Sequence, residues 1–217
     1  MGSTFANIAV RTASREKIVE FLKKKRHRAY VSPVHGKWLI IYDRKHEDSP
    51  DHGYELAENI SKKFQTTVFV FSVVDSDFFF YTLLYHGVCY DQYVNRADKY
   101  FAQIPVKNIP AKIRTKEKFT KRFKGNEQAI IKFAIMSPTA LFVNIRSKKN
   151  FMLKRKIHSV LSRKQTFAED GLRALAELLG IKKDYCSDGY EYLSDDGKEA
   201  MGAAFNTFIH VKGPCKN

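Results

Sequence analysis

The sequence predicts an α+β protein, with an antiparallel sheet in its first half and mainly helices in its second. Short apolar runs rich in β-branched and aromatic residues recur through the first hundred residues, separated by two segments of helical period. Beyond residue 125 the apolar residues recur mostly at helical spacing. The expected order is β-α-β-β-α-β-β-β, a weak internal repeat, and terminal short strands follow the helical half. This order suits a split β-α-β arrangement with both helices on one face.

The first elements follow from local signals. Residues 5–10 alternate in hydropathy and predict a strand. Ser14 is expected to cap a helix that continues to about Lys25, because a serine hydroxyl can accept a hydrogen bond from a free N–H of the first turn. A short strand, a turn and a stronger strand from Lys37 to Tyr42 come next.

The second helix and the strands after it are expected between residues 51 and 94, and the second copy of the repeat lies within them at residues 59–87. Asp51 is expected to cap this second helix, and two strands then flank the "VDSD" segment. Asp75 and Asp77 in that segment have the spacing of carboxylates that share a divalent cation. Aspartate and serine are also the residues that tight turns use, and the apolar runs on either side need a corner here. We therefore interpret the segment as a hairpin corner, and Gly87 as the next tight turn.

The last ninety residues predict helices and a final pair of strands. Gly180 is expected to end one helix, and Thr166 with Glu169 to form the capping box that begins it. In an earlier helix, Phe151 is expected to face inward. The predicted helices lie in "NEQAIIKFAIM", "NFMLKRKIHSVLSRK" and "FAEDGLRALAELLG", and the predicted strands in "GYEYL" and "FNTFIHV". We expect a sheet domain over 1–105, a basic linker or arm over 106–125, and over 126–217 a helical region that ends in the strand pair. Whether this last region packs with the sheet domain as one unit or forms a unit of its own is left open by the sequence.

The charge of the chain indicates the class of partner. Lysine and arginine total 38 against 23 acidic residues, a formal net charge of +15. Such a surface favours polyanions: nucleic acid, anionic lipid or an acidic protein face. Three basic clusters stand out: the 106–125 arm, residues 146–164, and "KKKRHR" at 23–28. The candidate contacts, all in the first two clusters, are Lys112, Arg114, Lys116, Lys118, Lys121, Arg122, Lys124, Lys148, Lys149, Lys154, Arg155 and Lys156.

These clusters lead to the hypothesis of a non-enzymatic binding protein that engages DNA, RNA or an acidic protein partner, as an immunity or effector-type protein would. We expect no cofactor. The alternative is a small metal-dependent enzyme that uses loop 43–55, where Asp43, His46 and His52 have the chemistry of zinc or manganese ligands. No HExxH pattern supports this alternative. Cys89 and His86 are close enough in sequence for a nucleophilic pair, but a buried structural cysteine is the favoured interpretation.

The remaining motifs point to a reducing compartment. Cys89, Cys186 and Cys215 are widely spaced, and neither a CxxC pair nor a disulfide framework is evident. We expect a cytoplasmic protein with no secretory signal and no membrane-spanning segment.

Three stretches carry a resemblance: "FVFSVVDSDFFFYTLLYHGVCYDQYV", "ADKYF", and "FAEDGLRALAELLGI" with the later "GYEYL". Together they resemble an uncharacterised bacterial family in which a DSD hairpin precedes a D-x-Y strand and a C-terminal helix ends in Leu-Gly-Ile. The resemblance spans most of the chain. It implies one α+β unit with a helical second half and assigns no catalytic residues.

Overall fold

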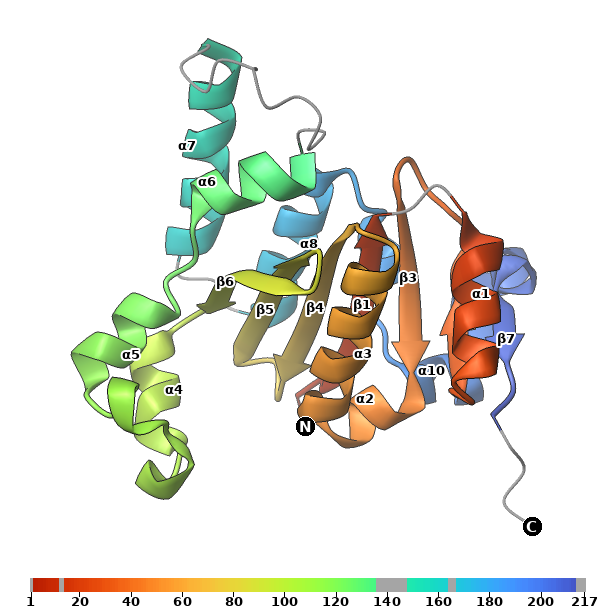
Figure 1. Ribbon diagram of the computed structural model, residues 1–217, viewed down its shortest axis with the longest axis horizontal. Coiled ribbons are helices and arrows are strands. Elements are labelled where there is room, and N and C mark those ends of the chain that lie inside the picture. The colour runs from red at the N-terminus through yellow and green to blue at the C-terminus, as the bar shows by residue number, and fades with distance from the viewer. Residues whose placement is uncertain (1, 12–13, 136–147, 164–166, 214–217) are drawn as a thin grey trace.

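The computed structural model describes residues 2–11, 14–135, 148–163 and 167–213. In this part of the chain, seven antiparallel strands form one sheet in the order β6-β5-β4-β1-β3-β2-β7 (Figure 1). The strands are β1 Phe5–Arg11, β2 Ala29–Val31, β3 Trp38–Asp43, β4 Thr67–Val74, β5 Phe78–Tyr85, β6 Val88–Val94 and β7 Ile209–Val211.

Helices cover both faces of this sheet and extend beyond it at the β6 edge (Figure 1). The α-helices are α1 Arg15–Lys24, α2 Arg44–Asp48, α3 Pro50–Lys63, α4 Ala97–Gln103, α5 Lys116–Arg122, α6 Glu127–Ile130, α7 Lys148–Ser162, α8 Ala168–Leu179, α9 Lys183–Cys186, α10 Tyr190–Asp195 and α11 Gly197–Met201. The shorter turns are the 3-10 turns η1 Val106–Asn108, η2 Ala111–Ile113 and η4 Gly202–Thr207, and the π-helical turn η3 Ile131–Ile135, which continues α6.

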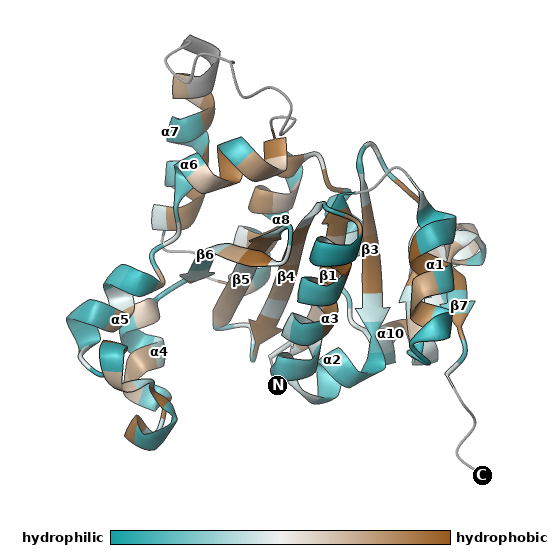
Figure 2. Cartoon of the chain, in the orientation of Figure 1, coloured by the Kyte–Doolittle hydropathy of each residue, from teal (hydrophilic) through white to brown (hydrophobic). Residues whose placement is uncertain are grey.

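The predicted α+β class and the order of its first half are confirmed. Strands β4-β1-β3-β2 with α1 and α3 on one face are the split β-α-β arrangement. Strands β5 and β6 extend the sheet past β4, and β7 extends it past β2. The helical C-terminal half adds a third layer on the opposite face, which explains why the strands are apolar on both sides (Figure 2).

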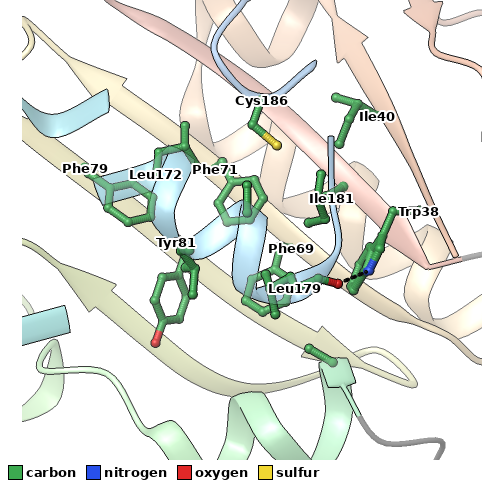
Figure 3. Packing of buried hydrophobic residues seen from close by; sticks show 14 of the residues in the cluster. Trp38, Ile40, Phe69, Phe71, Phe79, Tyr81, Leu172, Leu179, Ile181 and Cys186 are labelled. Carbon is green, nitrogen blue, oxygen red and sulfur yellow. Dashed lines mark hydrogen bonds between the residues drawn. The ribbon is translucent and has the colours of Figure 1, made fainter. Parts of the chain in front are cut away.

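The C-terminal layer packs on an aromatic sheet face. Phe69 and Phe71 of β4 and Tyr81 of β5 lie against α8 (Figure 3). The indole nitrogen of Trp38 donates a hydrogen bond of 2.9 Å to the carbonyl of Leu179 at the end of α8, so the buried N–H is satisfied (Figure 3). The second half of the chain therefore belongs to the main core, while the domain boundaries at 105 and 125 remain predictions.

Several local predictions are confirmed. The Ser14 hydroxyl accepts a hydrogen bond from the Lys17 N–H and caps α1. Gly180 ends α8 in the left-handed conformation, with φ of 72°. Asp75 and Ser76 both have positive φ in the three-residue loop that joins the paired residues Val74 and Phe78, and the Asp77 N–H donates a hydrogen bond of 3.1 Å to the carbonyl of Val74. The DSD segment is a hairpin corner.

Other predictions are wrong. The expected loop 43–55 is largely helical, and Ser49 rather than Asp51 occupies the N-cap of α3. The segment "GYEYL" begins helix α10 instead of a strand, and β7 pairs with β2 rather than with that segment. Thr166, half of the expected capping box, lies outside the described residues. Its predicted partner Glu169 accepts a hydrogen bond from the Ser76 hydroxyl.

Candidate nucleic-acid interface

Residues 97–124 form a compact projection, which we call the arm, beside the β6 edge of the sheet (Figure 1). The arm packs on the sheet through a small apolar cluster that includes Phe78 of β5, and within it Phe119 of α5 packs against Phe101 of α4 with ring centroids 5.3 Å apart. The Thr115 hydroxyl caps α5 by accepting a hydrogen bond from the Lys118 N–H. The predicted basic segment 106–125 is thus a folded part of the arm rather than an extended linker.

The arm carries a large share of the protein's charge. It holds nine basic residues and two acidic ones, a net charge of +7 out of +15. Its Lys and Arg side chains are exposed because the apolar residues of α5 face α4. The predicted contacts on the arm are Lys112, Arg114, Lys116, Lys118, Lys121, Arg122 and Lys124, and all are exposed.

Some of these cations have partners within the protein. Lys116 forms an ion pair of 3.8 Å with Asp98, and Arg122 donates a hydrogen bond of 2.8 Å to the Gln92 side chain. Lys118, Lys121 and Lys124 form no ion pair with any described residue. All three lie on α5 or shortly after it, so positive charge without an ion-pair partner is concentrated on one short segment. Two of them, Lys121 and Lys124, also line a shallow hollow with Asp98 and Lys116.

The base of the arm is fixed to the edge strand β6. The Val94 N–H donates a hydrogen bond of 3.0 Å to the carbonyl of Phe123, and Tyr93 forms a β-bridge with Lys124. Two residues further on, the Asn126 N–H donates a hydrogen bond of 2.7 Å to the Asp91 carboxylate. These contacts satisfy part of the free edge of β6 and hold the arm in one orientation.

Asp91 joins the arm to the core. Its buried carboxylate also accepts a hydrogen bond of 2.6 Å from the Tyr81 hydroxyl. Burial raises the pKa of Asp91, while the hydrogen bonds from Tyr81, Asn126 and Gln92 act in the opposite direction because they stabilise the carboxylate. A Cβ at Gly125 would lie 2.8 Å from the Tyr81 hydroxyl, so this close approach requires glycine.

Helix α7 provides the second basic segment. It is held to the core by Ile157, which is fully buried, and by the Tyr93 hydroxyl, which donates a hydrogen bond of 2.8 Å to the carbonyl of Leu161. Predicted contacts Lys154, Arg155 and Lys156 are exposed on this helix, and Lys148 and Lys149 lie in its first turn. The prediction that Phe151 faces inward is wrong, because its side chain is 57% exposed.

The structure brings two of the three basic clusters to one side of the molecule. The arm and α7 both lie at the β6 edge, and Gly125 at the end of the arm lies against Leu161 of α7 (Figure 1). The cluster at 23–28 begins in the last turn of α1, which packs near β7 at the opposite edge of the sheet (Figure 1). Sequence alone had left the convergence of these clusters open.

The residues of the metal alternative have structural roles. Asp43 is buried, accepts a hydrogen bond from the His46 N–H, and lies 2.7 Å from Nδ1 of His27. His46 is buried against Gly53, and burial lowers its pKa to about 4. His52 is exposed on α3. Among the described residues, no three His, Cys, Asp or Glu side chains come together to hold a metal ion.

The cysteine and histidine of the hairpin differ in environment, since His86 is exposed and Cys89 is not. Cys89 is half-buried on β6, and burial raises the pKa of its thiol, which disfavours the reactive thiolate. The ring of His86 stacks on Tyr85, with centroids 3.9 Å apart. The structural interpretation of Cys89 agrees with this environment.

The aromatic contact between Tyr90 and Phe133 could not be predicted from any pattern in the sequence. Tyr90 occupies a β-bulge in β6: Leu83 pairs with Asp91 and Leu84 pairs with Cys89, which leaves Tyr90 as the extra residue. Its ring lies 4.0 Å from that of Phe133 in η3. A bulge depends on the pairing between two strands, so the spacing of apolar residues in one strand does not reveal it.

Two further findings complete the description. No helix in the described parts of the chain combines the length and apolar character needed to cross a membrane. Comparison of the chain with family models, curated proteins and solved structures found no match.

Proposed function

We propose that the protein is a non-enzymatic binding protein that engages nucleic acid through the arm and α7. One observation carries the proposal: two basic elements, the arm and α7, lie on the same side of the sheet (Figure 1). The arm and residues 148–163 together contain 15 of the 38 Lys and Arg residues but only two of the 23 acidic residues. Binding to a phosphate backbone requires this kind of uncompensated positive surface.

The anchoring of both elements supports the proposal. Ordering a flexible segment on binding costs free energy, whereas a preformed surface avoids most of that cost. Hydrogen bonds to β6 hold the base of the arm, and Tyr93 holds α7. The cations are therefore presented on a defined surface before any partner arrives.

The first experiment measures fluorescence polarisation of labelled DNA and RNA oligonucleotides between about 50 and 200 mM salt. The test variant replaces Lys118, Lys121 and Lys124 with glutamine. We expect it to lose about tenfold or more in affinity and to reduce the log–log salt slope by about 2, since each lost phosphate contact contributes about 0.7 to 0.9.

The matched control replaces Lys23, Lys24 and Lys25 with glutamine. These exposed lysines lie at the end of α1, so the control removes the same charge from the opposite edge of the sheet. It should retain the wild-type slope. Equal losses in the two variants would reject the arm as the interface, and no binding by the wild type at low salt would reject the proposed function. If the wild type bound an acidic protein and no nucleic acid, the partner would be an acidic protein surface instead of nucleic acid.

A further inference from the structure

Two aromatic side chains on the basic side of the molecule are unusually exposed. Tyr90 on β6 is 43% exposed and Phe151 on α7 is 57% exposed. The guanidinium carbon of Arg155 lies 5.9 Å from the centre of the Phe151 ring. Large exposed aromatic side chains next to cations are the groups on which unpaired bases stack.

Tyr90 belongs to a larger aromatic group at the end of the β5–β6 hairpin. Phe133 supports it from one side and also contacts Tyr85, with ring centroids 5.0 Å apart. The ammonium nitrogen of Lys132, which is exposed, lies 5.0 Å from the centre of the Phe133 ring. The bulge thus places a partly exposed, rigidly supported ring beside a cation at the edge of the sheet.

We propose that the protein binds nucleic acid in single-stranded form, with one base stacked on Tyr90 and another on Phe151. This inference rests on the proposed function, because the cations of the arm and α7 are taken to contact the phosphates. A duplex satisfies cations through its backbone but keeps its base faces stacked inside. Only an unpaired strand can present base faces to exposed rings.

Strand β6 connects Tyr90 to both basic elements, the arm and α7. Tyr93, which bridges to Lys124 at the base of the arm, is three residues from Tyr90, a distance of about 10 Å along the strand. Tyr93 also holds α7 through its hydroxyl. Tyr90 therefore lies on the strand that holds the arm, and Phe151 lies about 15 Å along α7 from the point where Tyr93 holds that helix.

An anionic membrane is a less suitable partner for this surface. Membrane-surface helices insert one continuous apolar face into the lipid. The apolar side of α7, centred on Ile157, is instead packed against the core, and the helix exposes Phe151 and Met152 next to basic residues. Tyr90, on a strand, lies outside any such helix face.

The test compares a labelled single strand of about 20 nucleotides with a duplex of the same length at one salt concentration. The variant Tyr90→Leu/Phe151→Leu removes both aromatic faces and retains apolar side chains. The control Tyr192→Leu/Phe167→Leu changes an exposed tyrosine and an exposed phenylalanine on other elements, and these are also 43% and 57% exposed. Thermal unfolding of all variants shows whether a loss of affinity reflects a loss of stability. The single variant Phe151→Leu adds a second test, because it changes only the more exposed ring.

We expect the wild type to bind the single strand at least about tenfold more tightly than the duplex. The test variant should lose about fivefold or more per ring on the single strand and little on the duplex, while the control retains both affinities. Unchanged single-strand affinity, or equal losses on both forms, would reject the stacking inference and leave the proposed function intact. Binding to phosphatidylserine vesicles without binding to any nucleic acid would reject the proposed function itself.

Discussion

At the scale of single residues, several side chains with the chemistry of ligands serve the fold. Asp43 caps α2 and pairs with His27, so its carboxylate already has partners. The His46 ring is so close to α3 that a Cβ at Gly53 would lie 1.9 Å from it. Burial keeps this imidazole neutral near pH 7, since its pKa is lowered to about 4. Histidine is a common metal ligand, but the His46 side chain packs α2 against α3.

Glu47 gives a residue-scale prediction of pH dependence. Its carboxylate accepts a hydrogen bond of 2.8 Å from the Glu191 N–H at the start of α10, yet burial raises its pKa from 4.5 to about 7. A carboxyl whose pKa is raised on folding contributes stability that is complete below the unfolded pKa and is lost as pH rises through the folded value. We therefore expect Glu47→Gln to become progressively more stable relative to the wild type between about pH 5 and 8.

Urea unfolding of both proteins across this pH range checks the prediction. The difference between the two free energies of unfolding isolates Glu47, because groups common to both proteins, such as Asp188 with a pKa near 6, contribute equally. A difference that does not change with pH would contradict the assignment.

At the scale of elements, the arm depends on its connection to β6. Asp91 accepts hydrogen bonds from the Tyr81 hydroxyl and from the Asn126 N–H just beyond the arm. The apolar cluster of the arm includes Phe78 of β5 and Val94 of β6, so this cluster and the hydrogen bonds at β6 together set the orientation of the arm on the sheet. A binding surface of defined geometry requires both the apolar cluster and the hydrogen bonds at β6.

We expect Asp91→Asn to lower the free energy of unfolding by about 1–3 kcal/mol, because a buried amide replaces an acceptor that serves several donors. Tyr81→Phe removes one of these hydrogen bonds and should cost about 0.5–1.5 kcal/mol. Amide hydrogen exchange adds a local reading: protection of the Asn126 N–H should fall in Asp91→Asn and persist in Tyr81→Phe. Equal protection in both variants would argue against Asp91 as the anchor.

At the scale of the whole molecule, positive charge is concentrated on the β6 side of a three-layer core. The concentration suits a polyanion but destabilises the free protein through repulsion among like charges. Nine basic residues against two acidic ones within 28 residues make this repulsion strongest in the arm. A surface that binds by charge is expected to reduce stability when no partner is bound.

The whole-molecule prediction follows from this repulsion. At low salt, replacing Lys118, Lys121 and Lys124 with glutamine should raise the free energy of unfolding by a few tenths of a kcal/mol. The melting temperature should rise slightly as a result. Added salt should raise the melting temperature of the wild type more than that of the variant, because screening removes the same repulsion. Calorimetry at two salt concentrations tests both statements, and a variant that is less stable at low salt would show that these lysines support the fold.

Features that depend on neighbouring residues could be predicted from the sequence. Ser14 caps α1, Gly180 ends α8, and the DSD turn forms a hairpin, since each follows from the conformational preferences of a few consecutive residues. The failures depend on distant contacts. "GYEYL" alternates like a strand, but its Tyr190 and Leu193 are both buried at helical spacing, and Glu47, 144 residues from its partner Glu191, binds the first turn.

The candidate site divides in the same way. By itself, the sequence determined the α+β class, the order of the sheet elements and the presence of basic segments, because periodicity and charge are properties of short stretches. Only the tertiary structure decided that the arm and α7 share the β6 edge, that the third cluster lies at the other edge, and that Phe151 and Tyr90 are exposed. The physical reason is that strand pairing and helix packing join residues far apart in the chain, and no local pattern records which distant surfaces meet.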